Sequence, residues 1–130
     1  VPYSPLGRGF LTGEVKRAED YPETDYRRND PRYQGANFDA NMELVATVKR
    51  IADTHGATPA QIALAWLLAQ GPDIIPIPGT KKVKRLEENA GAADLALTAA
   101  DVAALNAAAP VGGTAGERYD TPGKLAMLRI

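Results

Sequence analysis

The sequence contains no cysteine, only one histidine and only one tryptophan among its 130 residues. Without cysteine, neither a disulfide framework nor a zinc site built on thiolates is possible. The charges are balanced, with 15 Lys and Arg against 16 Asp and Glu, so no excess of one sign attracts nucleic acid or an acidic membrane. No apolar run reaches the roughly 18 residues of a membrane span. We therefore expect a cytoplasmic protein with no nucleic-acid partner, no membrane partner and no metal site.

The most informative stretch is residues 74–89, with the sequence IIPIPGTKKVKRLEEN. Residues 74–77 form an apolar run that is typical of a buried parallel strand. Pro78 and Gly79 end this run with a turn. Val83, Leu86 and Ala90 then recur at helical spacing, as on the apolar face of a short helix. The stretch predicts a strand, a tight turn and a helix.

The start of this predicted helix carries groups that bind anions. Backbone N–H groups at a helix N-terminus attract negative charge, and Thr80, Lys81 and Lys82 add a hydroxyl and two positive charges there. Arg85 follows one turn later. We predict a phosphate site, and we keep as the alternative a solvated basic face on which Arg85 only pairs with Glu88.

A second candidate segment opens the chain. Residues 1–4 have the pattern of a strand end, and residues 4–13, SPLGRGFLTG, form a loop whose glycines let backbone approach a ligand closely. Tyr3 offers a ring for stacking, and Ser4 offers a hydroxyl to a phosphate oxygen. Because most glycine-rich loops merely turn the chain, this segment alone is weak evidence.

Together, the two segments resemble the aldo-keto reductase family, in which YSPLGRGFLTG and IPIPGTKKVKRLEENAGA occur in this order. The connecting DPRYQGANF and ATPAQIALAWLLAQG are also similar to family patterns, so the resemblance covers essentially the whole chain. It implies an α/β fold in which the segments are the seventh and eighth strands of a (β/α)8 TIM barrel. A complete barrel needs at least about 200 residues. Residues 1–130 are therefore interpreted as the C-terminal, cofactor-binding part of an incomplete barrel, with several helices and two parallel strands near residues 1–4 and 73–77.

The resemblance implies roles as well. The substrate would be a small-molecule carbonyl compound, and the catalytic tetrad of Asp, Tyr, Lys and His comes from the first half of the family's barrel. No residue of this chain matches that tetrad. The implied cofactor-binding residues are Tyr3 under the nicotinamide; Ser4, Leu6 and Arg8 along the pyrophosphate; Gly79 at the turn; Thr80, Lys81 and Arg85 at the 2′-phosphate; and Glu88 and Asn89 at the adenine.

The charges favour NADPH as the cofactor. A phosphate prefers Arg and Lys as donors, whereas a site for NAD presents a carboxylate to the ribose hydroxyl, and Glu88 lies two turns beyond the helix start. The predicted function is the reduction of aldehydes or ketones with NADPH, with the missing N-terminal part of the barrel or another copy covering the apolar surfaces. The alternatives are a non-enzymatic nucleotide-binding or regulatory module, such as a channel-associated subunit, and an inactive fragment.

The remaining elements have local signals. Residues 39–55 predict a helix that Gly56 ends in a left-handed conformation, and His55 in its last turn is expected to interact with the helix dipole. Residues 62–69 are almost wholly apolar, so we expect this helix to be buried on more than one face. Residues 14–36 are polar without periodicity and predict a long loop, which either lies over the mouth of the barrel or is disordered and solvated.

Two helices are expected to begin with capping boxes. Thr58 precedes Pro59 and stands three residues before Gln61, which is the spacing of a box at a helix start. Thr98 and Asp101 have the same spacing. The final segment, residues 114–130, has no firm pattern.

Overall fold

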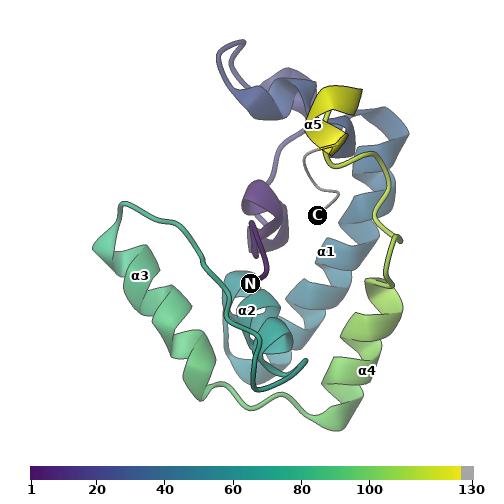
Figure 1. The fold of residues 1–130 in the computed structure, drawn as a ribbon. Helices are drawn as coiled ribbons and strands as arrows, with labels where there is room; N and C mark the ends of the chain where they lie inside the picture. The colour runs from purple at the N-terminus through teal and green to yellow at the C-terminus, as the bar shows by residue number, and fades with distance from the viewer. Residues whose placement is uncertain (127–130) are drawn as a thin grey trace. The chain divides into compact units, whose positions relative to one another are not determined.

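The computed structural model describes residues 1–126, which form five α-helices, five short 3-10 helices and the loops between them (Figure 1). None of the helices in this part combines the length and the apolar character that a membrane span requires. The α-helices are α1 (Gly35–His55), α2 (Pro59–Leu68), α3 (Val83–Ala90), α4 (Ala99–Ala108) and α5 (Pro122–Ala126). The 3-10 helices are η1 (Gly7–Thr12), η2 (Ala18–Asp20), η3 (Tyr26–Asn29), η4 (Pro31–Tyr33) and η5 (Gly91–Asp94).

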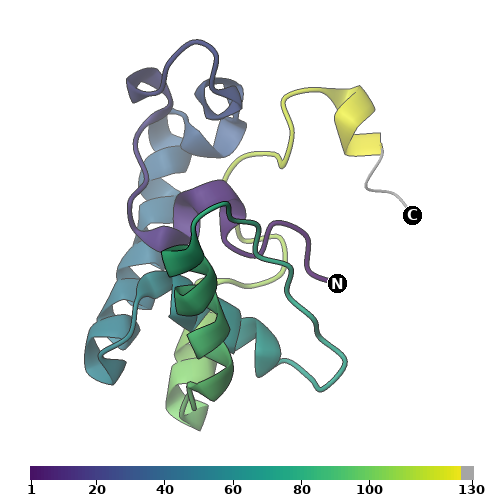
Figure 2. The same ribbon diagram turned by 90° about the vertical axis from the view of Figure 1, so that its left-hand side faces the viewer.

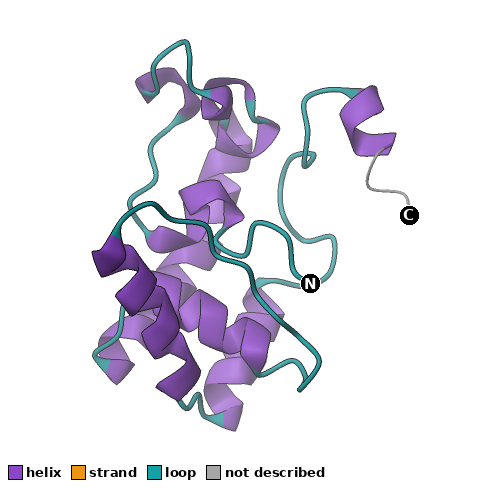
Figure 3. Ribbon diagram, turned by 60° about the vertical axis from the view of Figure 1, so that its left-hand side comes forward, coloured by secondary structure: helices purple, strands orange, loops and turns teal. Residues whose placement is uncertain are grey.

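Residues 1–126 contain no β-strand (Figure 3), so the two strands expected near residues 1–4 and 73–77 are not confirmed. Both stretches lie in loops, and Ile75 and Ile77, which we expected to be buried, are 62% and 53% exposed. A strand exists through its hydrogen bonds to a neighbouring strand, and the barrel implied by the resemblance takes its other strands from outside this chain. The expectation of parallel strands therefore applies to a complete barrel.

The chain divides into two compact units, of which the first comprises residues 1–15 and 44–108. Its core joins α1, α2 and α4, and α2 also contacts α3, η1 and η5 (Figure 2). The aliphatic side chains at the centre come from three helices, so they tie together parts of the chain far apart in sequence. They are Val48, Ile51 and Ala52 of α1, Ile62 of α2 and Leu105 of α4.

Helix α2 is buried on more than one face, as its composition predicts. Five of its ten residues are buried, and Ile62 has no exposed surface. Trp66 packs against the same core and donates its indole N–H to Asn106 Oδ1 at 2.8 Å. Trp66 is therefore part of the packing of this unit.

The predicted helix signals are confirmed. Thr58 Oγ1 accepts from the Gln61 N–H at 3.2 Å, and Gln61 Oε1 accepts from the Thr58 N–H at 3.0 Å, which is a complete capping box. At the start of α4, Thr98 Oγ1 accepts from the Asp101 N–H at 3.1 Å, and Asp101 Oδ2 accepts from the Thr98 N–H at 2.9 Å. Gly56 follows α1 with φ at +61°, the left-handed conformation expected of it.

His55 has a specific partner beyond the helix dipole. Its Nε2 lies 2.8 Å from Asp101 Oδ2, so the end of α1 is joined to the first turn of α4. Hydrogen bonds from Thr98 and then from His55 lower the pKa of Asp101 to about 2. His55 therefore connects two helices.

The second unit comprises residues 16–43 and 109–130, of which 109–126 are described. Of the long loop predicted for residues 14–36, ten residues lie in η2, η3 and η4, and α1 begins at Gly35, four residues before the predicted start of that helix. Tyr21 and Tyr33 meet edge to face with ring centroids 5.8 Å apart, and the Arg27 guanidinium lies 4.1 Å from the centroid of the Tyr21 ring. The prediction missed this order because aromatic and cation–π contacts produce no apolar periodicity.

Short polar caps complete the second unit. The side chains of Asp25 and Asp30 accept from backbone N–H groups two residues later, at 3.0 Å each, and so begin η3 and η4. Asn41, only 6% exposed, pairs with both backbone groups of Ala115 at 2.9 Å. These side chains substitute for regular backbone hydrogen bonding in a region without a large apolar core.

Candidate cofactor site

All ten predicted site residues lie in the first unit, in two segments. The N-terminal segment, which holds Tyr3, Ser4, Leu6 and Arg8, has an unusual backbone. Ser4 and Arg8 have φ angles of +53° and +60°, which are rare for residues with a side chain. Strain of this kind concentrates at functional sites. The ring of Tyr3 is 56% exposed.

The second segment surrounds the start of α3, and its predicted residues are Gly79, Thr80, Lys81, Arg85, Glu88 and Asn89. Thr80 Oγ1 accepts from the Lys82 N–H at 3.2 Å and so fixes the chain before the helix. Lys82 is the N-cap residue, and its side chain makes no capping hydrogen bond among the described residues. A Cβ on Gly79 would meet no atom within 4 Å. Lys81 is exposed, whereas Asn89 is half-buried.

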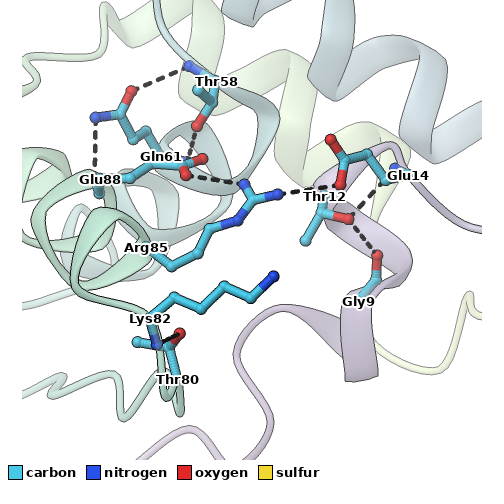
Figure 4. A network of polar contacts seen from close by, with 9 residues as sticks. All are labelled: Gly9, Thr12, Glu14, Thr58, Gln61, Thr80, Lys82, Arg85 and Glu88. Carbon is cyan, nitrogen blue, oxygen red and sulfur yellow. Dashed lines mark hydrogen bonds and ion pairs between the residues drawn. The ribbon is translucent and has the colours of Figure 1, made fainter.

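Arg85 is the centre of this segment (Figure 4). Its Nη1 donates to Glu88 Oε2 at 2.9 Å, and its Nη2 donates to Glu14 Oε2 at 3.1 Å. These carboxylates, with Glu88 contributing most, raise the pKa of Arg85. The pair with Glu88 that we weighed as the alternative is therefore present. The side chain of Arg85 is 42% exposed, so part of the guanidinium remains accessible.

Glu88 is held by the capping box of α2. Gln61 Nε2 donates to the Glu88 backbone carbonyl at 3.0 Å. Burial of the Glu88 carboxyl acts to raise its pKa, but hydrogen bonds from Thr58 and Arg85 outweigh this effect, and the net pKa is lowered. The side chain is only 13% exposed. The predicted contact of Glu88 with adenine is untested, and its described carboxylate contacts are with Thr58 and Arg85.

Glu14 was not predicted at the site, and Lys82 was named at the anion-binding helix start but not among the cofactor-binding residues. Glu14 was assigned to the following loop, yet its carboxylate reaches Arg85. The side chain of Lys82 runs beside Arg85 toward Thr12 and Glu14 (Figure 4). The sequence indicates Lys82 through its position at the start of the predicted helix. It gives no local sign of the ion pair between Glu14 and Arg85, because these residues are 71 positions apart.

The arrangement suits anion binding better than acid–base chemistry. Arg85 and Lys82 direct cationic groups to one side of the α3 start, and no capping side chain closes that start in the described structure. His55, the only histidine, is engaged with Asp101 between α1 and α4. Within residues 1–126, no three His, Cys, Asp or Glu side chains are grouped so that they could hold a metal ion.

Comparison with known proteins adds independent evidence. Residues 1–110 match the model of the aldo/keto reductase family. The chain is 54% identical over 119 residues to the aldo-keto reductase yakc of Schizosaccharomyces pombe, whose name specifies NADP(+). It is 50% identical over 118 residues to aldo-keto reductase str7 of Strobilurus tenacellus. These alignments cover 92% and 91% of this chain but only 35% of each relative, so the chain spans about a third of their length.

Proposed function

Because this chain belongs to the aldo/keto reductase family, we propose that it is the cofactor-holding part of an oxidoreductase that reduces aldehydes or ketones with NADPH. The observation that carries the proposal is the pair of cationic side chains, Arg85 and Lys82, at the uncapped start of α3. A phosphate monoester with nearly two negative charges is bound best by such donors at a helix N-terminus. The NADP(+) in the name of one relative agrees with this choice.

The proposed contacts follow the chemistry of each group. Tyr3 stacks under the nicotinamide, since its ring is largely exposed. The strained loop that follows lies along the pyrophosphate. The start of α3 meets the 2′-phosphate, and the end of the same helix reaches the adenine. The residues are Ser4, Leu6 and Arg8 at the pyrophosphate; Gly79, Thr80, Lys81 and Arg85 at and before the 2′-phosphate; and Glu88 and Asn89 at the adenine.

We also propose that this chain completes a (β/α)8 barrel, whose other strands come from the N-terminal part of a longer protein or from another copy. Ile75 and Ile77 are 62% and 53% exposed, and Val83 and Leu86 on α3 are 71% and 60% exposed. Four large exposed apolar side chains within twelve residues of sequence favour an interaction surface there. In this proposal the covering part also supplies the proton donor for the carbonyl substrate. A cytoplasmic location for this activity remains a prediction.

Replacement of Arg85 by alanine in the complete protein tests the cofactor assignment. A charge-assisted, bidentate contact with a phosphate contributes about 1.5–3 kcal/mol. Arg85→Ala should therefore weaken NADPH binding by roughly tenfold to a hundredfold, at about 1.4 kcal/mol per decade. NADH lacks the 2′-phosphate, so its affinity should hardly change. Fluorescence titration of both cofactors measures the two affinities directly.

The matched control is Lys84→Ala. Lys84 is an exposed cation on the same helix, next to Arg85 in sequence, so its removal changes the net charge equally. Lys84→Ala should leave the NADPH preference within about twofold. Equal losses of NADPH and NADH affinity in Arg85→Ala, or no loss of either, would exclude Arg85 from the 2′-phosphate site.

A further inference from the structure

Glu14 occupies the part of Arg85 that a phosphate needs. The guanidinium has two edges that can bind an anion with two parallel N–H groups, one formed by Nη1 and Nη2 and the other by Nε and Nη2. Both edges include Nη2. In the structure, Nη2 donates to Glu14 Oε2 at 3.1 Å. Nη2 carries one N–H on each edge, and Glu14 accepts from Nη2, so a phosphate bound at either edge shares this nitrogen with the Glu14 carboxylate.

The two carboxylates at Arg85 are held differently. Glu88 binds Nη1, is 13% exposed and is fixed by its hydrogen bond with Thr58. Glu14 is 75% exposed, and its backbone is attached through its N–H to Thr12 Oγ1 at 3.3 Å, while Thr12 Oγ1 donates to the Gly9 carbonyl at 2.7 Å. An exposed side chain is displaced more easily than one that is buried and hydrogen-bonded. An incoming anion would therefore displace Glu14 and leave Glu88 in place.

We propose that Glu14 is a specificity-determining residue that competes with the 2′-phosphate for Arg85 and thereby limits the preference for NADPH over NADH. This inference rests on the function proposed above. The carboxylate of Glu14 also repels a phosphate at the same guanidinium, because like charges a few ångströms apart oppose each other even near solvent. NADH has a ribose hydroxyl at this position, which carries no charge for Glu14 to repel.

The expected effect has the size of an exposed ion pair. Such pairs are worth up to about 1 kcal/mol, which corresponds to about fivefold in affinity. In the complete protein, Glu14→Gln should therefore strengthen NADPH binding about two- to fivefold and leave NADH binding unchanged. The same gain is expected for 2′,5′-ADP, which carries the 2′-phosphate without the nicotinamide, and not for 5′-AMP. Isothermal titration calorimetry with the four ligands measures these changes.

Glu87→Gln is the matched control. Glu87 is an exposed acid on α3, in the same turn as Glu88, and its replacement removes the same charge without removing the contact with Arg85. Its effect on NADPH binding should be less than half that of Glu14→Gln. Equal gains in the two variants would overturn the proposal in favour of a general charge effect. Weaker NADPH binding in Glu14→Gln would also overturn it, because Glu14 would then help to hold the bound cofactor.

Arg85→Ala separates this proposal from the proposed function. When Arg85 is absent, Glu14→Gln should change NADPH affinity by less than half as much as it does with Arg85 present, because the competition for Arg85 is gone and only the direct repulsion remains. If Arg85→Ala removes the NADPH preference but Glu14→Gln has no effect, only the role of Glu14 is wrong. If Arg85→Ala leaves the preference intact, the assignment of the 2′-phosphate site itself fails.

Discussion

Helices α2 and α3 contact each other, but their N-termini are built in opposite ways. At α2, Thr58 and Gln61 satisfy each other's backbone N–H groups. At α3, Lys82 is the N-cap and makes no capping bond with its side chain among the described residues. Every helix begins with backbone N–H groups that lack a partner within the helix. At α2 the Thr58 side chain satisfies one of them, the N–H of Gln61, whereas at α3 the Lys82 side chain satisfies none in the described part of the chain and the Arg85 N–H is bonded to the Lys82 carbonyl.

The two helices also differ in how many of their residues are buried. Helix α2 contributes five buried residues to the first unit, whereas α3 has no buried residue. The first helix therefore stabilises the fold, and the second presents charged groups. The contrast suggests that changes in α2 should alter stability with little effect on cofactor preference, and changes in α3 should do the reverse.

The largest effect is expected when α2 loses core volume. Ile62 has no exposed surface and lies at the centre of the core. Ile62→Ala should lower the free energy of unfolding by about 2–5 kcal/mol, because it removes buried methyl groups and leaves a cavity. Urea denaturation followed by circular dichroism measures the loss. The ratio of NADPH to NADH affinity in the folded variant should stay within about twofold of the original.

Two further variants make this test decisive. Ile62→Val should cost about 0.5–1.5 kcal/mol and remains measurable if the alanine variant does not fold. Val111→Ala removes methyl groups from a fully exposed side chain and should cost under about 0.5 kcal/mol. A loss of less than 1 kcal/mol for Ile62→Ala would contradict the role assigned to α2.

An intermediate effect is expected from the closed start of α4. The hydrogen bonds from Thr98 and then from His55 lower the pKa of Asp101 from 3.8 to about 2. The unfolded chain therefore takes up a proton at higher pH than the folded protein, and acid favours unfolding. The stabilisation from Asp101 should be complete above pH 3.8 and should disappear as the pH falls toward 2.

Asp101→Asn tests this pH dependence. The original protein should be more stable than the variant at pH 5, and the difference should shrink as the pH is lowered to 2. Urea midpoints measured at several pH values between 2 and 5 give the comparison, and other carboxylates contribute equally to both proteins. A difference that does not change with pH would mean that Asp101 does not titrate with a lowered pKa.

Local signals account for what the sequence predicts well. The capping pairs at residues 58–61 and 98–101, the left-handed Gly56 and the helical spacing of residues 83–90 each depend on neighbours within one or two turns. They can therefore be identified without tertiary information.

Contacts between distant segments account for what could not be predicted. The strands expected near residues 1–4 and 73–77 need partner strands, and residues 1–126 form none. The order of residues 16–34 depends on contacts such as that between Tyr21 and Tyr33. The ion pair between Glu14 and Arg85 joins two segments that are adjacent only after folding. The cofactor residues themselves were inferred from the resemblance, because short-range chemistry indicates an anion site without specifying NADPH.

The smallest effects are expected from threonines at the two contrasting helix starts. Thr58→Ala removes the capping side chain of α2 and should cost about 1 kcal/mol in the free energy of unfolding. Thr80 Oγ1 accepts from the exposed N–H of Lys82, so Thr80→Ala should cost a few tenths of a kcal/mol.

The order of the two threonines should reverse for binding, since Thr80 is proposed to contact the 2′-phosphate. Loss of its hydrogen bond to the charged phosphate should weaken NADPH binding by about tenfold, whereas Thr58→Ala should change it by less than twofold. Thr58→Ser retains the hydroxyl and should restore most of the lost stability. Urea denaturation and cofactor titration of the three variants measure both effects. Equal stability losses for Thr58→Ala and Thr80→Ala would show that the threonine before α3 stabilises its helix as much as the threonine before α2 does.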